Sequence, residues 1–121
     1  MFTIEFYEDK NGKSEIKDYL DLLLEQSSSN KDSRIQYKQM VRYIELLSEN
    51  GTQLPKEVTK HLDGEIWELR PGNNRVLYFF YTNNTYVLLH HFRKKTQKTP
   101  RREIERALLE MNDYLARKKG L

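Results

Sequence analysis

The chain has 121 residues, with 21 Lys and Arg against 18 Asp and Glu, and it contains no cysteine. This length fits one domain spanning residues 1–121, which can bury one sizeable core without covalent staples. The lack of cysteine excludes disulfides, thiolate catalysis and cysteine-based zinc sites, and it fits a reducing compartment. We find neither a signal-peptide pattern nor an apolar run near 20 residues, so we expect a soluble, cytoplasmic protein.

The charge is unevenly distributed along the chain. Residues 1–92 carry 11 Lys and Arg against 14 Asp and Glu, whereas residues 93–121 carry 10 against 4. Six basic residues and no acidic one lie between positions 93 and 102. An acidic body with a basic end indicates a polyanionic partner such as a nucleic acid. The alternative interpretation is a solvated, lysine-rich C-terminal helix.

The N-terminal half predicts a strand followed by a helical hairpin. Residues 2–7 alternate apolar and polar side chains, which is typical of a half-buried strand. Ser14 is a suitable N-cap for a helix whose apolar stripe consists of Ile16, Tyr19, Leu20, Leu23 and Leu24. Residues 26–30 interrupt this pattern, and a second stripe follows at Ile35, Met40, Val41, Ile44 and Leu47. The second helix should end at Gly51, which can adopt a positive φ.

The C-terminal half predicts three strands and a last helix. Residues 51–64 are expected to form a connection, with a short turn allowed at 57–61. Strands are expected at 65–70, 75–82 and 85–92, with Asn83–Asn84 as a two-residue hairpin turn. Thr99 is the expected N-cap of the last helix, with Pro100 as its first residue. The apolar stripe of that helix is Ile104, Ala107, Leu108, Met111 and Leu115.

This β-α-α-β-β-β-α order indicates an α+β, two-layer domain. The three C-terminal strands should form an antiparallel meander, and the first strand should pair with one of them. We expect the helices to cover one face of the sheet and to leave the other face partly open.

Motifs for bound groups are missing from the sequence. It has no phosphate-binding glycine loop, no HExxH, no cluster of three acidic residues and no redox fingerprint. We therefore expect neither a cofactor nor a metal.

The chemistry-bearing residues are cations at strand ends. Arg70 and Arg75 flank the turn at 71–74, and further cations follow the last strand at Arg93, Lys94, Lys95 and Lys98. In an antiparallel meander they meet at one edge. Such a cluster can hold a phosphodiester and stabilise its transition-state charge, while RNA supplies its own 2′-OH nucleophile. The alternative interpretation is structural, with Arg70 and Arg75 bracing Glu65 or Glu68 across strands.

The general base stays open between the histidines and a lysine of lowered pKa. His90 and His91 should point to opposite faces of the last strand, so at most one lines the site. Either histidine also fits a simple packing role.

The motif "ELR…RVLYFF…LLHHFRKKTQKTP…EIERAL" resembles the HigB-like toxins of the RelE/ParE superfamily, which include phage-derived Gp49-like proteins. The resemblance implies a RelE-like fold and the toxin of a type II toxin–antitoxin pair, acting as a metal-independent, ribosome-dependent mRNA endoribonuclease. It implies a helix-turn-helix, HigA-like antitoxin as partner, besides the ribosome and mRNA. Operator DNA would be bound only through the antitoxin complex. The catalytic positions implied are Arg70, Arg75, Lys94 and Lys95, and the implied contacts to RNA or the ribosome are Arg93, Lys98, Arg101, Arg102 and His91.

The sequence departs from some RelE-like relatives in the strand before Arg70. Those relatives carry lysines there, whereas this chain has Ile66 and Glu68, so a general base from this strand would have to be Glu68. Two other functions stay open. One is a ParE-like inhibitor that binds gyrase and needs no catalytic residue. The other is a non-catalytic, nucleic-acid-binding subunit.

Overall fold

The computed structural model describes residues 1–120. In chain order, its elements are β1 (Thr3–Phe6), α1 (Glu15–Gln26), α2 (Lys31–Asn50), β2 (Thr59–Asp63), β3 (Ile66–Leu69), β4 (Asn74–Tyr81), β5 (Thr85–Arg93) and α3 (Arg101–Lys119). The α+β class is confirmed. No helix within residues 1–120 combines the length and the hydropathy needed to cross a bilayer.

The five strands form one sheet in the order β1-β5-β4-β3-β2. The meander β3-β4-β5 is antiparallel, as predicted. The first strand, β1, pairs with β5 in parallel, with Thr3 opposite Thr85. The two-residue turn between β4 and β5 is also confirmed, because Asn83 and Asn84 have φ of 57° and 58°, the left-handed conformation that such a turn requires.

The strand β2 is not predicted from the sequence, where its residues are expected to form a connection. It pairs with β3 at the edge of the sheet, where Lys60 and His61 stay exposed. An edge strand that is mostly exposed lacks the apolar alternation that identifies a strand in a sequence. The inward-facing Thr59 is the exception, since its hydroxyl donates to the carbonyl of Glu68 at 2.9 Å.

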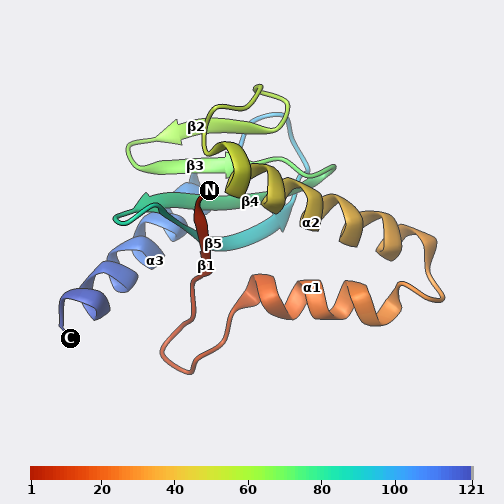
Figure 1. The fold of residues 1–121 in the computed structure, drawn as a ribbon, viewed down its shortest axis with the longest axis horizontal. Coiled ribbons are helices and arrows are strands. Elements are labelled where there is room, and N and C mark those ends of the chain that lie inside the picture. Colours follow the sequence, from red (N-terminus) through yellow and green to blue (C-terminus); the bar gives the residue numbers. More distant parts are fainter. Residues whose placement is uncertain (121) are drawn as a thin grey trace.

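The predicted two-layer arrangement is wrong, because helices cover both faces of the sheet (Figure 1). The hairpin α1–α2 packs on one face, and its core consists of Ile16, Leu23, Met40, Leu47, Leu69, Val76, Tyr78, Tyr86 and Leu88. The helix α3 packs on the other face, over Ile66, Leu77, Phe79, Val87 and Leu89. Both faces of β4 and β5 are therefore buried, which explains why these strands are apolar on both sides.

The helix boundaries follow local capping. The predicted N-cap Ser14 accepts a hydrogen bond from the amide of Lys17 at 3.2 Å, and Gly51 ends α2 with a φ of 59°. Thr99 is not an N-cap, because α3 is preceded by Pro100 and has no side-chain cap. The Thr99 hydroxyl instead donates to Glu68. Each predicted apolar stripe includes one terminal residue that is exposed in the structure. These residues are Leu24, Ile35 and Leu115.

Truncating a core residue of β5 tests this arrangement. Leu88 is fully buried, so Leu88→Ala should lower the free energy of unfolding by about 2–5 kcal/mol through lost contacts and the cavity left behind. Urea denaturation followed by circular dichroism measures this change. The matched control is Leu109→Ala on α3, whose side chain is 72% exposed and which should shift stability by less than about 0.5 kcal/mol. Equal effects of the two substitutions would contradict the assignment of Leu88 to the core.

Candidate functional site: a cation cluster at one end of the sheet

Two arginines face each other where β3 ends and β4 begins. The antiparallel register pairs Leu69 with Val76, so the next pair outward is Arg70 and Arg75. Both side chains approach the same carboxylate oxygen of Glu68, with Arg70 Nε at 3.3 Å and Arg75 Nε at 3.9 Å from Oε2. The predicted meeting of Arg70 and Arg75 is therefore observed, and so is the alternative that Glu68 braces them.

Glu68 lies at the centre of this cluster. Its side chain is only 2% exposed, and its other oxygen, Oε1, accepts the hydrogen bond from Thr99. Burying a carboxylate is costly unless it is paired and hydrogen-bonded, and here both oxygens have partners. One carboxylate between two guanidinium groups leaves the trio with a net charge of +1. Because Glu68 is buried and engaged, it is poorly placed to accept a proton from a substrate.

Arg75 is held rigidly. Its Nη1 donates to the carbonyls of Gly72 at 2.9 Å and Asn74 at 2.8 Å, and its side chain is 8% exposed. Burial and the neighbouring charge of Arg70 lower the pKa of Arg75, while Glu68 opposes that shift. Arg70 is more accessible at 21% and is anchored by a hydrogen bond from Nη1 to the carbonyl of Lys56 at 3.1 Å.

The basic segment after β5 continues from this end of the sheet. Phe92 lies opposite Arg75 and Arg93 lies opposite Asn74, and the amide of Lys94 donates to the carbonyl of Asn73 at 2.8 Å. The Thr99–Glu68 hydrogen bond then attaches the far end of the segment to the arginine pair. The segment from Lys94 to Thr99 is thus hydrogen-bonded at its start to the β3–β4 turn and at its end to β3. Arg70 and Arg75 flank that turn.

The cations of this segment differ in how far they are compensated. Within residues 1–120, Arg93, Lys94, Lys95 and Lys98 have no carboxylate at ion-pair distance. Arg101, in contrast, pairs with Asp63 at 2.5 Å and Glu105 at 3.7 Å. Arg102 approaches Glu103 at 3.9 Å. Within the basic stretch 93–102, the uncompensated charge is therefore concentrated at residues 93–98, next to the turn at 71–74.

The two histidines lie outside the cluster and on opposite faces of β5, as predicted. His90 is fully buried on the α3 face, where Nδ1 lies 2.5 Å from Glu110 and Nε2 lies 3.0 Å from Glu103. His91 lies under α1, stacked on Tyr19 with ring centroids 4.1 Å apart. Its side chain is 12% exposed, which leaves little surface for the contact with RNA that the family resemblance implies.

A register irregularity in β5 determines which histidine faces which helix. Leu77 pairs with His90 but Tyr78 pairs with Leu88, so Leu89 is an extra residue between them. A bulge of this kind shifts the alternation of side chains by one residue. Leu89 and His90 consequently both face α3, and His91 faces α1.

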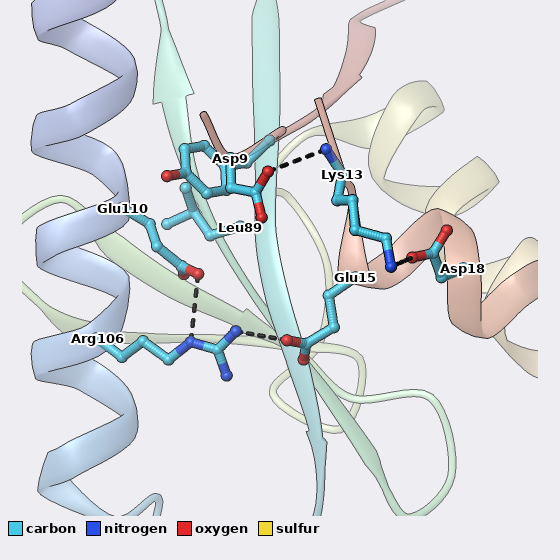
Figure 2. Close-up of a pocket in the computed structure, with 8 residues that line it drawn as sticks. Asp9, Lys13, Glu15, Asp18, Leu89, Arg106 and Glu110 are labelled. Carbon is cyan, nitrogen blue, oxygen red and sulfur yellow. Dashed lines mark hydrogen bonds and ion pairs between the residues drawn. The ribbon is translucent and has the colours of Figure 1, made fainter. Parts of the chain in front are cut away.

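A cavity beside the β1–α1 connection lies away from the cation cluster. It measures about 310 Å³ and lies between α3 and the connection from β1 to α1 (Figure 2). Arg106 crosses it, contacting Glu15 of α1 at 2.5 Å and Glu110 of α3 at 3.3 Å, and Lys13 approaches Asp18 at 3.9 Å. Both cations of this lining are paired with carboxylates, so we interpret the cavity as part of the attachment of α3 to the body.

The requirements of a metal site are not met by the described residues. Among residues 1–120, no group of three His, Cys, Asp or Glu side chains gathers closely enough to hold a metal ion. The cluster can bind an anion, orient it between two guanidinium groups and offset negative charge.

The comparisons with known proteins identify the family. The family described as "Phage derived protein Gp49-like (DUF891)" matches residues 29–112, a range that includes Glu68, Arg70, Arg75, Lys94 and Thr99. The chain belongs to this family. Among solved structures it is similar to the archaeal RelE–RelB complex from Pyrococcus horikoshii OT3, with 14% identity over 80% of this chain and 98% of that chain and a TM-score of 0.46. No curated protein matches the chain.

Removing the central carboxylate tests the cluster. Glu68→Gln leaves two guanidinium groups without their counter-charge, so we expect the free energy of unfolding to fall by about 3–5 kcal/mol. Chemical denaturation measures the change. The control is Asp63→Asn, which breaks the more exposed pair with Arg101 and should cost less than about 1 kcal/mol. A Glu68→Gln protein as stable as the control would show that the arginines do not depend on this carboxylate.

The environment of His91 gives a prediction on pH. Burial lowers the pKa of His91 from 6.5, and the nearby Glu15 only partly offsets this. The unfolded chain therefore binds a proton more readily, and stability should fall as the pH drops below about 6.5, by at most about 1.4 kcal/mol per pH unit for one proton. His91→Phe, which keeps a ring against Tyr19, should flatten the decline between pH 7 and 5 in thermal or urea denaturation. The difference between the free energies of unfolding of the two proteins at pH 8 is the baseline. If the two curves of unfolding free energy against pH stay parallel below pH 6.5, His91 is not the cause of the decline.

Proposed function

We propose that this protein is the toxin of a type II toxin–antitoxin pair, an RNA-cleaving enzyme of the HigB type that acts on mRNA at the ribosome. The observation that carries the proposal is the arginine pair at the open end of the meander, joined through Thr99 to a segment of uncompensated cations. Membership of the Gp49-like family and the motifs around Arg70, Arg75 and Lys94 support the same conclusion.

The proposed chemistry uses the 2′-OH of RNA as the nucleophile. Arg75 would stabilise the negative charge that develops on the phosphate, because a rigid, preorganised donor costs little reorganisation in the transition state. Arg70, which is more exposed, would position the phosphate, and Lys94 would add charge from the segment. Lys95 or Lys98 would transfer a proton or contact ribosomal RNA. Arg93, Arg101 and Arg102 would contribute to RNA binding, the last two after exchanging their carboxylate partners for phosphates.

The proposed partner in the resting state is a helix-turn-helix, HigA-like antitoxin. An acidic or amphipathic segment of that partner would cover residues 93–98, where repulsion between like charges favours a counter-charged surface. The proposed location of the toxin is the cytoplasm, where translating ribosomes are found.

One observation favours the second candidate, a ParE-like protein that inhibits gyrase by binding. Neither His90 nor His91 reaches the cluster, and the carboxylate within it, Glu68, is buried and engaged. A catalytic site needs a group that accepts a proton, whereas a protein-binding inhibitor does not. The two candidates differ in the cellular response to induction, which is loss of full-length mRNA for the nuclease and a DNA-damage response for the gyrase inhibitor.

Substitution at the cluster separates function from folding. Arg75→Ala and Lys94→Ala should each relieve growth arrest on induction, and each should slow cleavage of a reporter transcript by about 100-fold or more, the usual cost of removing a donor to transition-state charge. Primer extension with and without ribosomes measures cleavage, and circular dichroism confirms folding. Lys10→Ala, at an exposed position in the β1–α1 connection, is the control and should remain toxic. Full toxicity of the Arg75→Ala/Lys94→Ala double variant would refute the nuclease proposal.

A further inference from the structure

A second basic surface lies on α2, outside the site described above. Lys31, Arg34, Lys38 and Arg42 follow one another at intervals of three and four residues and are all exposed. At 3.6 residues per turn they lie on one face, about 16 Å long, directly opposite the buried Met40 and Leu47. We call these four residues the α2 stripe.

The charge of the α2 stripe is almost uncompensated. Within residues 1–120, Lys31, Arg34 and Lys38 have no carboxylate at ion-pair distance, and Arg42 has only Glu49 at 3.9 Å. Arg34 is nevertheless held in place by a hydrogen bond to the carbonyl of Ser27 at 2.9 Å.

The pattern also opposes the helix dipole. Lys31 and Arg34 lie in the first turn of α2, next to its positive end, where Asp32 is the acidic residue, while the last turn has no basic residue and contains Glu49. Cations at a helix N-terminus are unfavourable for helix stability. Helix formation therefore does not explain why the positive charges lie in this half of α2.

The position of the α2 stripe relates it to the arginine cluster. The middle of α2 lies against the β3–β4 turn, because Gln39 packs over Gly72 and Asn74 Nδ2 donates to Gln36 Oε1 at 3.2 Å. From there, the N-terminal half of α2 projects past the end of the sheet that carries the turn (Figure 1). The stripe and residues 93–98 thus flank the same end of the sheet from its two faces.

We propose that the α2 stripe binds the phosphate backbone of RNA, as a second contact surface beside the arginine cluster. The inference rests on the proposed function only in naming RNA as the polyanion. Protein–protein interfaces need a buried apolar or aromatic centre. On α2 the large exposed apolar side chain is Ile35, at 44%, and the exposed Leu22 and Leu24 belong to the other helix of the hairpin, α1. Nucleic-acid interfaces are polar and strongly positive, as this surface is. The exposed Asp21 and Glu25 on α1 would repel the same backbone and confine it to α2.

The experiment compares two triple variants of equal net charge. Lys31→Gln/Arg34→Gln/Lys38→Gln removes the unpaired stripe cations, and Lys10→Gln/Lys118→Gln/Lys119→Gln removes three exposed cations elsewhere. Binding of a fluorescein-labelled oligouridylate of about 20 nucleotides is followed by anisotropy at several KCl concentrations, with circular dichroism to confirm folding. For single strands each lost phosphate contact changes the slope of log K against log [salt] by about 0.7. For the stripe variant the magnitude of this slope should therefore be smaller than for the wild type by about 2, and binding at 0.1 M salt should be weaker on the order of 100-fold. The control variant should match the wild type in both.

Equal slopes for the stripe variant and the control would overturn the proposal. So would binding of labelled polyglutamate as strong as that of the oligouridylate and equally dependent on the stripe, because the surface would then suit an acidic protein. Reporter cleavage on ribosomes, measured in parallel, tests the other proposal. If the stripe substitutions reduce the salt slope but the wild-type protein does not cleave the reporter, the nuclease proposal alone is refuted. If the wild-type protein cleaves the reporter but the stripe substitutions leave the salt slope unchanged, this inference alone is refuted.

Discussion

The buried carboxylate of Glu68 organises the end of the molecule that carries the candidate site. It lies between Arg70 and Arg75 and accepts a hydrogen bond from Thr99, so a single group connects β3, β4 and the segment before α3. Two guanidinium groups on adjacent strand ends repel each other, and their meeting requires a counter-charge. That counter-charge also orients the arginines and leaves the trio with net positive charge. The segment at 94–99 is therefore attached to the site, and its cations are kept near the arginine pair.

The bulge in β5 has a comparable role for the rest of the sheet. By placing Leu89 and His90 on the same face, it brings His90 between Glu103 and Glu110 of α3 and turns His91 under α1. Each histidine thus supports a helix on its own side of the sheet. Arg106 adds a link between the helices, since it contacts both Glu15 and Glu110 (Figure 2). The histidines that suggest proton transfer in the sequence serve packing in the structure.

The sequence was informative wherever one residue pattern decided the local structure. The caps at Ser14 and Gly51, the Asn83–Asn84 turn and the antiparallel meander all follow from short-range rules, and the meander in turn placed Arg70 opposite Arg75. The edge strand β2 was not predicted, because its mostly exposed side chains do not alternate between apolar and polar. The placement of α3 opposite the hairpin depends on tertiary packing, although the apolar character of both faces of β4 was a signal for it. Thr99 was predicted to be a cap because it directly precedes Pro100, and local rules could not show that its hydroxyl bonds to Glu68, 31 residues away.

The distribution of charge on the two helical layers fits one direction of approach for a polyanion. On one face of the sheet, the N-terminal half of α2 projects past the β3–β4 turn with most of the α2 stripe, and on the other face residues 93–98 leave the end of β5. The arginine pair lies between them, more buried than either surface. A surface charge attracts a polyanion over a distance set by screening, whereas buried, oriented guanidinium groups act only at contact. In the proposed function the two kinds of group would have different roles, because the exposed lysines and arginines would hold the RNA backbone and the rigid arginines would contact one phosphate at the end of the sheet.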